Sequence, residues 1–295
     1  MKKILILGKQ SPIAVAVYEL ILKETDWIVS LELDNYTHSD SDEKYLEPIF
    51  YDKKTIRKVV MDYNPGYIIN LLSYDIAEKC EEHRKECWDF NVGTVEALSK
   101  AAFMTEAKLI VFSSDNIFDG TNGPYSEDAL PYPLNYYGKT KLGCDNLLLA
   151  SSIPFTSIRL PEYYGNNNSI GSNIFYNIIN KKSMSLSVNS FTNPILLDDI
   201  ALGVIKIIEG NKTGFYHFGG PDYISEYEYA IKIVDYLGMD KSLILPYTYS
   251  SENAKIKKYL RGGLINLKSE VELGINFVNL HSGLTTVRFQ INYNN

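Results

Sequence analysis

Tyr137 and Lys141 are four residues apart at a point where the sequence predicts the start of a helix. Residues at positions i and i+4 share one face of a helix, so the phenol and the ammonium would point the same way. A phenol has a pKa near ~10 in water, and its phenolate needs roughly 3 units of stabilisation to exchange protons at neutral pH. A fixed ammonium can supply much of that stabilisation. The pair therefore predicts a proton-transfer site.

Ser113 and Ser114 complete this arrangement, because they end an apolar run from Lys108 that is typical of a buried strand. A serine hydroxyl beside the phenol can hold a carbonyl or alcohol oxygen. We therefore predict that Ser114, Tyr137 and Lys141 are catalytic residues for carbonyl reduction, in which a cationic nicotinamide ring would also stabilise the phenolate. By itself the Tyr-x-x-x-Lys spacing is weak, since the chain has 23 tyrosines. A surface aromatic beside a solvated lysine is the alternative.

The surrounding stretch, residues 111–142, adds a longer pattern. Ser-Ser-Asp is followed by Ile-Phe-Asp-Gly, by a Pro-Tyr pair with two acidic residues, and by Tyr-Gly and Thr-Lys-Leu. This pattern closely resembles that of the dTDP-4-dehydrorhamnose reductase (RmlD-like) family of extended short-chain dehydrogenases/reductases. The likeness covers almost the whole chain and is densest from Ile69 to Lys141. It is carried in this stretch by Ser113, Ser114, Asp115, Ile117, Phe118, Asp119, Gly120, Pro124, Tyr125, Glu127, Asp128, Pro133, Tyr137, Gly138, Thr140, Lys141 and Leu142.

The resemblance implies an NAD(P)H-dependent reductase of the 4-keto group of a nucleotide-activated deoxysugar, acting in nucleotide-sugar and polysaccharide biosynthesis. Hydride would reach the sugar C4 while Tyr137 protonates the oxygen. Two alternatives stay open. One is an epimerase or dehydratase on the same scaffold. The other is a non-catalytic regulatory subunit resembling the beta subunit of methionine adenosyltransferase.

Composition excludes several other classes of protein. A net charge of −7 and the lack of a basic stripe argue against a nucleic-acid partner. No apolar stretch reaches the ~18 residues of a membrane span, because the N-terminal apolar run is interrupted from Lys9 to Pro12. We expect a cytoplasmic protein without a membrane partner. Three cysteines without a C-x-x-C pair and four scattered histidines predict neither a disulfide framework nor a metal site.

Strand-like and helix-like segments alternate along the first half of the chain. Such alternation predicts an α/β fold with a doubly wound parallel sheet (Rossmann) and a site at the C-terminal edge of its strands. Residues 1–165 are expected to form the dinucleotide-binding domain and 166–295 mainly a smaller mixed α/β substrate-binding lobe, with some segments returning to the core. The sequence leaves the oligomeric state open, with a homodimer as one candidate. The predicted strands are 3–8, 27–34, 67–72, 108–114 and 154–160, and the predicted helices include 12–23 and 135–150.

The turn after the first strand is the expected cofactor phosphate site. The resemblance implies three glycines here, but the chain has Gly8, Ser11 and Ala14. Small residues still let the backbone approach a pyrophosphate at the helix N-terminus, so Gly8, Gln10, Ser11, Pro12 and Ile13 are predicted to contact the cofactor. The alternative is a turn that no longer binds a nucleotide.

Asp34 ends the second predicted strand. A carboxylate there suits the ribose hydroxyls of NAD and repels the 2′-phosphate of NADP, which slightly favours NAD. The polar run from Asn35 to Lys44 could instead fold back, leaving Asp34 to cap a turn. Asp52 matches an aspartate that the family has near the adenine, and capping of the following helix is an equal alternative.

Further site residues are implied by the resemblance alone. Cofactor contacts are implied for Leu71, Leu72, Ser73, Asn91, Phe112, Ser113, Tyr137, Lys141 and Pro161. For Asn91 the alternative is an interior amide satisfied by a neighbouring loop. Substrate contacts are implied for Ser73, Tyr74, Ser114, Asn116, Tyr137, Glu162, Asn193 and Arg261. Asn116 replaces a more usual tyrosine and Glu162 a more usual tryptophan, so the sugar and the nucleotide base stay open.

Three other charged or polar motifs are interpreted as structural. Arg159 is expected in an ion pair. Asp198 and Asp199 stand where a helix begins and are interpreted as capping residues. Ser225 with Glu228 matches a capping box.

Overall fold

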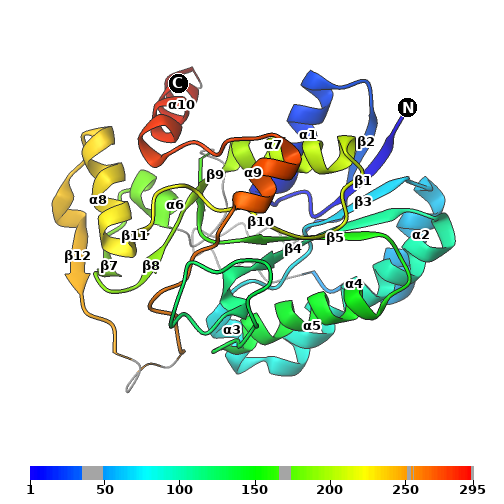
Figure 1. Cartoon of the computed structure of the whole chain (residues 1–295), viewed down its shortest axis with the longest axis horizontal. Helices are drawn as coiled ribbons and strands as arrows, with labels where there is room; N and C mark the ends of the chain where they lie inside the picture. The colour runs from blue at the N-terminus through cyan, green and yellow to red at the C-terminus, as the bar shows by residue number, and fades with distance from the viewer. Residues whose placement is uncertain (35–48, 166–173, 251–253, 255, 294–295) are drawn as a thin grey trace.

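The computed structural model describes residues 1–34, 49–165, 174–250, 254 and 256–293. Its centre is a six-stranded sheet in the order β10-β5-β4-β3-β1-β2 (Figure 1). Every neighbouring pair in this sheet is parallel. The strands are β1 (Lys3–Leu7), β2 (Ile28–Glu32), β3 (Tyr67–Asn70), β4 (Lys108–Ser114), β5 (Phe155–Leu160) and β10 (Gly214–His217).

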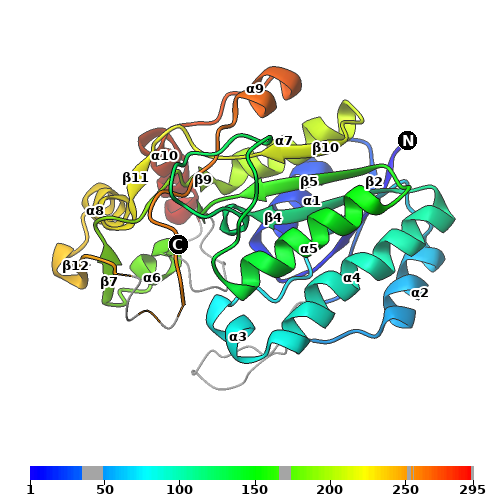
Figure 2. The same ribbon diagram turned by 60° about the horizontal axis from the view of Figure 1, so that its bottom comes forward.

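Helices cover both faces of the sheet (Figures 1 and 2). One apolar core lies between the sheet and α1 and α7, and a second lies between the sheet and α2, α4 and α5. A parallel sheet covered in this way needs strands that are apolar on both faces, as β1 and β3 are. The helices are α1 (Pro12–Glu24), α2 (Lys53–Tyr63), α3 (Ala77–Glu82), α4 (Arg84–Thr105), α5 (Tyr136–Ala150), α7 (Leu197–Glu209) and α9 (Leu267–Leu273). The predicted doubly wound fold is confirmed.

A small lobe lies at one end of the sheet and has its own apolar core (Figure 1). Short strand pairs, β6 with β9, β7 with β12 and β8 with β11, link its parts. Because α7 and β10 belong to the sheet layers, the chain passes between the lobe and the sheet more than once. The division at residue 165 stays a prediction. The lobe elements are β6 (Tyr163–Tyr164), α6 (Ile174–Ile179), β7 (Met184–Ser187), β8 (Phe191–Thr192), β9 (Ile195–Leu196), β11 (Ile224–Ser225), α8 (Glu226–Leu237), η2 (Lys241–Leu243), β12 (Ile244–Tyr247) and α10 (Leu280–Tyr293).

Helix starts follow the capping residues in the sequence. Asn135 precedes α5 and accepts a hydrogen bond from Gly138 N at 2.8 Å. Ser225 caps α8 by accepting from Glu228 N at 3.1 Å, as predicted. Asp198 and Asp199 lie in the first turn of α7, as predicted, but the N-cap is Leu196 and has no side-chain hydrogen bond. Asp199 Oδ2 instead accepts from Val278 N at 2.8 Å, so the predicted capping role is wrong for Asp199. No helix in the described part of the chain is long and apolar enough to cross a bilayer.

Cys80 and Cys87 form a disulfide with an S–S distance of 2.22 Å. The sequence predicted no disulfide, and for this pair that prediction is wrong. The bond crosses the short junction between α3 and α4, where the two Cα atoms are 5.2 Å apart. That separation lies within the range that a disulfide spans. Cys144 is a free, buried cysteine.

A buried ion pair ties α5 to the sheet, which confirms the structural role predicted for Arg159. Asp145 Oδ2 lies 3.1 Å from Arg159 Nε, and the two side chains are only 1% and 4% exposed. The same carboxylate accepts hydrogen bonds from Ser157 Oγ at 2.7 Å and from Ser113 Oγ at 3.4 Å. One side chain of α5 is therefore fixed to both β4 and β5.

Asp145→Asn keeps the size of this side chain but leaves the Arg159 charge buried without its counter-ion. We expect the free energy of unfolding, measured by urea denaturation, to fall by about 3–5 kcal/mol. Asp89→Asn is the matched control, since it breaks an exposed ion pair with Lys85 that is worth about 0–1 kcal/mol. Equal losses in the two variants would contradict the structural role of Asp145.

Candidate active site

Ser114, Tyr137 and Lys141 meet in one cleft at the C-terminal edge of the sheet. The end of β4 presents Ser114, whose hydroxyl lies near enough to the Tyr137 phenol to lower the pKa of that phenol. Lys141 Nζ lies 5.4 Å from the centroid of the Tyr137 ring and donates to Ser73 Oγ at 2.8 Å and to Phe112 O at 3.1 Å. The structure therefore brings the three predicted catalytic residues together. The ammonium of Lys141 is held by Ser73, which follows β3, and by Phe112 of β4.

Gly138 allows this close approach. Its position faces the short helix η1 (Asp115–Ile117), and a Cβ atom there would lie 2.1 Å from Asn116 O. No side chain fits in that space, so only glycine lets the first turn of α5 rest against the backbone that follows Ser114. This contact sets how closely Tyr137, the residue before Gly138, approaches Ser114.

The cleft holds the Tyr137 phenol in its protonated form. Burial raises the pKa of Tyr137 well above its usual value, and the carboxylates of Asp75 and Asp115 raise it further, whereas the hydrogen bond with Ser114 lowers it. Burial also lowers the pKa of the Lys141 ammonium. A proton-bearing phenol beside a hydroxyl suits a group that gives a proton to a developing oxyanion.

The far end of the cleft lies at the turn from β1 into α1. Gly8 has φ 104°, which glycine adopts without strain and which turns the chain from β1 into α1. Ser11 is the N-cap of α1 but makes no capping bond with its side chain, and it faces the cleft together with Ile13. A free hydroxyl at the positive end of a helix is a suitable phosphate site. The predicted cofactor residues that line the same cleft are Leu71, Leu72, Ser73, Asn91, Phe112, Ser113 and Pro161.

Gln10 and Pro12 lie in the turn itself. Pro12 is buried at the first position of α1, where a missing N–H costs nothing. Gln10 is half-buried. Neither lines the cleft, so their predicted contact with the cofactor stays a prediction.

Asp34 and Asp52 stand apart from the catalytic end. Asp34 follows β2 and is half-buried, and its backbone N–H donates to the Tyr51 hydroxyl at 3.1 Å. The run from Asn35 to Lys44 lies outside the described residues. Asp52 accepts from Thr55 N at 2.7 Å and caps α2, which matches the capping alternative.

Asn91 links the loop after β3 to the catalytic helix. Its Oδ1 accepts from Tyr74 N at 2.7 Å, and its Nδ2 donates to Tyr74 O at 3.0 Å and to Thr140 Oγ1 at 2.8 Å. This is the interior amide given as the alternative, although Asn91 also lines the cleft. The Tyr74 side chain lies in the second apolar core and does not line the cleft. Its predicted substrate contact is therefore not supported.

Asn193 also has a structural position. It is 5% exposed, and its Nδ2 donates to Gly220 O and to Leu264 O, both at 2.8 Å, while its Oδ1 accepts from Leu264 N at 2.9 Å. The amide thus joins three loops, and its predicted contact with the substrate stays a prediction. A long-range network of this kind leaves no local signal in the sequence.

The other predicted substrate residues have mixed positions. Asn116 is half-buried, and its Nδ2 donates to Ser114 Oγ at 3.1 Å, next to the catalytic serine. Glu162 is half-buried at the start of the small lobe, directly before the cleft residue Tyr163. Arg261 is exposed beside β8 and does not line the cleft.

Asp75 and Tyr163 are cleft residues that the sequence analysis missed. Asp75 follows β3, and Tyr163 begins β6. Asp75 raises the pKa of Tyr163 as well as that of Tyr137, so its carboxylate lies close to both phenols. A polar residue just after a buried strand of a parallel sheet was the available signal for Asp75.

A family model described as the RmlD substrate binding domain matches residues 1–290 of the chain. The chain belongs to this family. The resemblance inferred from the sequence is thereby confirmed, and the match extends over the sheet and the small lobe alike.

The relatives of the chain include proteins with different names. The dTDP-4-dehydrorhamnose reductase of Aggregatibacter actinomycetemcomitans is 29% identical over 195 residues, which are 62% of this chain and 65% of that protein. Methionine adenosyltransferase 2 subunit beta of Bos taurus is 27% identical over 217 residues, 70% of this chain and 65% of the subunit. The match therefore spans less than two thirds of either relative.

Solved structures share the fold over nearly the whole chain. A dTDP-4-dehydrorhamnose reductase from Clostridium acetobutylicum has a TM-score of 0.84 and 22% identity, covering 98% of this chain and 99% of that one. The same enzyme from Bacillus anthracis, in complex with NADP, has a TM-score of 0.84 and 19% identity with the same coverage. At these identities the likeness demonstrates a common fold.

Proposed function

We propose that the protein is an NAD(P)H-dependent reductase of the 4-keto group of a nucleotide-activated deoxysugar. The observation that carries this proposal is the meeting of Ser114, Tyr137 and Lys141, with the ammonium beside the phenol, in a cleft that continues to the N-terminus of α1. Family membership supports the same activity, and the reductase from Aggregatibacter actinomycetemcomitans is a named example.

Each catalytic side chain has one task in this reaction. A reduced nicotinamide supplies the hydride when it is bound. Ser114 holds the carbonyl oxygen of the sugar, and Tyr137 gives its hydroxyl proton to that oxygen, so the ketone becomes a secondary alcohol. Lys141 stabilises the phenolate that remains and is itself held by Ser73 and Phe112. The Leu71 and Leu72 side chains exclude water from the inner wall of the cleft.

Two other functions have a specific observation in their favour. The likeness to methionine adenosyltransferase 2 subunit beta, together with Ser11 and Ala14 in place of glycines, favours a regulatory subunit. The Asp75 carboxylate in the cleft favours an epimerase or dehydratase, because both remove a proton next to a keto group. The complete Ser114, Tyr137 and Lys141 set favours the reductase over the regulatory subunit.

Tyr137→Phe removes one phenol oxygen and with it the proton donor. We expect kcat for NAD(P)H oxidation with dTDP-4-keto-6-deoxyhexoses to fall about 100- to 10,000-fold, with cofactor affinity unchanged. Tyr136→Phe, one residue earlier in α5, is the control and should keep wild-type activity. Cofactor binding without turnover of any ketosugar would instead support the regulatory subunit. Solvent deuterium uptake at the sugar C5 without cofactor oxidation would support the epimerase or dehydratase.

We propose NAD as the preferred cofactor, on the basis of the Asp34 carboxylate at the end of β2. Asp34→Ser should improve kcat/KM with NADPH relative to NADH by roughly tenfold, because the charge that repels a 2′-phosphate is gone. Asp26→Ser, before the opposite end of the same strand, should leave the ratio unchanged. A wild-type preference for NADPH would contradict this assignment.

Asp75→Asn should move the high-pH limb of the kcat profile for ketosugar reduction to lower pH. The carboxylate raises the pKa of Tyr137, so its neutralisation lowers that pKa. The phenol then loses its proton, and the reaction its acid, at a lower pH. Glu78→Gln removes a nearby exposed carboxylate and should leave the profile in place. An unshifted profile in Asp75→Asn would show that Tyr137 does not set this limb.

A further inference from the structure

The Ser114 hydroxyl accepts two hydrogen bonds from one neighbour. Its Oγ accepts from the backbone N–H of Asn116 at 3.2 Å, which makes Ser114 the N-cap of η1, and from Asn116 Nδ2 at 3.1 Å. A hydroxyl oxygen has two acceptor lone pairs and one proton. Asn116 therefore occupies both acceptor positions, and the hydroxyl has only its proton to offer to another group.

Within the chain that proton has a weak acceptor. Ser114 Oγ lies 3.3 Å from Asp115 Oδ1, which is longer than the roughly 2.5–3.0 Å of an ordinary O–H···O hydrogen bond. Ser114 also lines the cleft. A carbonyl oxygen that enters the cleft can therefore accept this proton at a better distance than Asp115 does.

The orientation of the Asn116 amide decides this arrangement. Asn116 Oδ1 accepts from Asn135 Nδ2 at 3.1 Å, and Asn116 Nδ2 lies 3.4 Å from Asp115 Oδ1. If the oxygen and nitrogen of the Asn116 amide were exchanged, an N–H would face the N–H of Asn135, and the amide oxygen would face the Asp115 carboxylate. Both contacts would be repulsive, so the Nδ2 side of Asn116 must face Ser114.

Asn135 is fixed in turn by two backbone groups. Its Oδ1 accepts from Gly138 N at 2.8 Å in the first turn of α5, and its Nδ2 donates to Lys257 O at 3.3 Å. A backbone N–H can only donate and a backbone carbonyl can only accept, so the Asn135 amide cannot turn over. Asn135 is only 4% exposed, and water therefore hardly competes for these positions.

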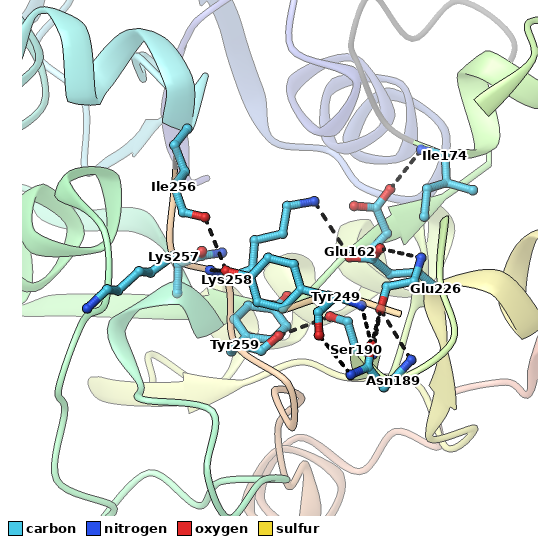
Figure 3. Close-up of polar contacts among 12 residues, drawn as sticks. Glu162, Ile174, Asn189, Ser190, Glu226, Tyr249, Ile256, Lys257, Lys258 and Tyr259 are labelled. Carbon is cyan, nitrogen blue, oxygen red and sulfur yellow. Dashed lines mark hydrogen bonds and ion pairs between the residues drawn. The ribbon is translucent and has the colours of Figure 1, made fainter. Parts of the chain in front are cut away.

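The direction of the Lys257 carbonyl is also set. The backbone N–H of Lys258 donates to the Tyr249 hydroxyl at 3.0 Å, and that hydroxyl donates to Ile256 O at 3.3 Å (Figure 3). The N–H and C=O of a trans peptide unit point in opposite directions, so the bond to Tyr249 turns Lys257 O toward Asn135. The segment after β12 thereby fixes the Asn135 amide.

A relay of hydrogen bonds thus runs from Lys257 O through Asn135 and Asn116 to Ser114. We propose that Asn116 and Asn135 are positioning residues that restrict the Ser114 hydroxyl to the donor role and direct its proton at the keto oxygen of the substrate. This assignment rests on the proposed reductase function and deepens it. The relay also keeps the Tyr137 proton for the reaction, because a Ser114 oxygen with both lone pairs occupied cannot accept it. Ser114 counteracts the rise in the pKa of the Tyr137 phenol, as a donating hydroxyl does.

Neutron diffraction from a deuterated crystal of the wild-type protein tests the relay directly. The method locates exchangeable hydrogens and needs neither turnover nor a variant. We expect one Nδ2 deuteron of Asn116 to point at Ser114 Oγ, and the Ser114 deuteron to point away from Asn116. A Ser114 deuteron directed at the Asn116 side chain would overturn the proposal, whatever the activity of the protein.

Asn116→Asp keeps the shape of the side chain but gives Ser114 an acceptor in place of a donor. The Ser114 proton then binds the carboxylate, and we expect kcat for ketosugar reduction to fall about 10- to 100-fold, with the Kd of the reduced cofactor unchanged. Asn122→Asp is the matched control. Asn122 is exposed, and its Nδ2 donates to Thr121 Oγ1 at 3.3 Å, so the same added charge should leave kcat unchanged.

A double-mutant cycle with Ser114→Ala separates positioning from a merely structural role. If Asn116 acts through the Ser114 hydroxyl, Asn116→Asp should cause no further loss of kcat once that hydroxyl is gone. Asn135→Ser keeps a good helix cap but has no amide to fix Asn116, so it should lower kcat only where Ser114 is present. Losses that multiply in the double variants would overturn the proposal. The expected deuteron positions without reduction of any ketosugar would overturn only the reductase function.

Discussion

The Asp145 carboxylate is the interaction on which the site depends most. It lies one turn after Lys141 on α5 and binds Arg159 and Ser157 of β5 and Ser113 of β4. The catalytic phenol and ammonium are thus fixed relative to the strand that carries the catalytic serine. A buried ion pair adds little to net stability, because desolvation offsets its attraction. What it provides here is a fixed position of the helix on the sheet.

Electrostatic character changes along the cleft. At the cofactor end the N-terminus of α1 and the Ser11 hydroxyl favour negative phosphates. In the middle Lys141 is the cation beside the reacting phenol. Toward the small lobe the Asp75 carboxylate lines the cleft beside Tyr163. A ligand with a polyanionic end and a cationic or strongly hydrogen-bonding end would therefore be oriented before any contact with Tyr137.

Local patterns in the sequence predict the sheet and the catalytic residues well. Apolar runs gave β1, β3, β4 and β5 within one or two residues, and the capping roles of Asn135 and Ser225 depend only on near neighbours. The roles of Asn193 and Tyr74 could not be found in this way, because their partners are set by tertiary packing. The Cys80–Cys87 disulfide was missed because it depends on how tightly α3 turns into α4. Glu162 was placed near the substrate by resemblance, but the charges that act on it come from three other segments, at Asp115, Glu226 and Lys258.

The contact at Gly138 limits how this protein can diverge. The first turn of α5 and the backbone at Asn116 touch without an intervening side chain, so a larger side chain at position 138 would push them apart. New substrate specificities must therefore arise from residues that do not take part in this contact, such as those of β6 and α8. The chemistry of the cleft can stay unchanged while its substrate range evolves.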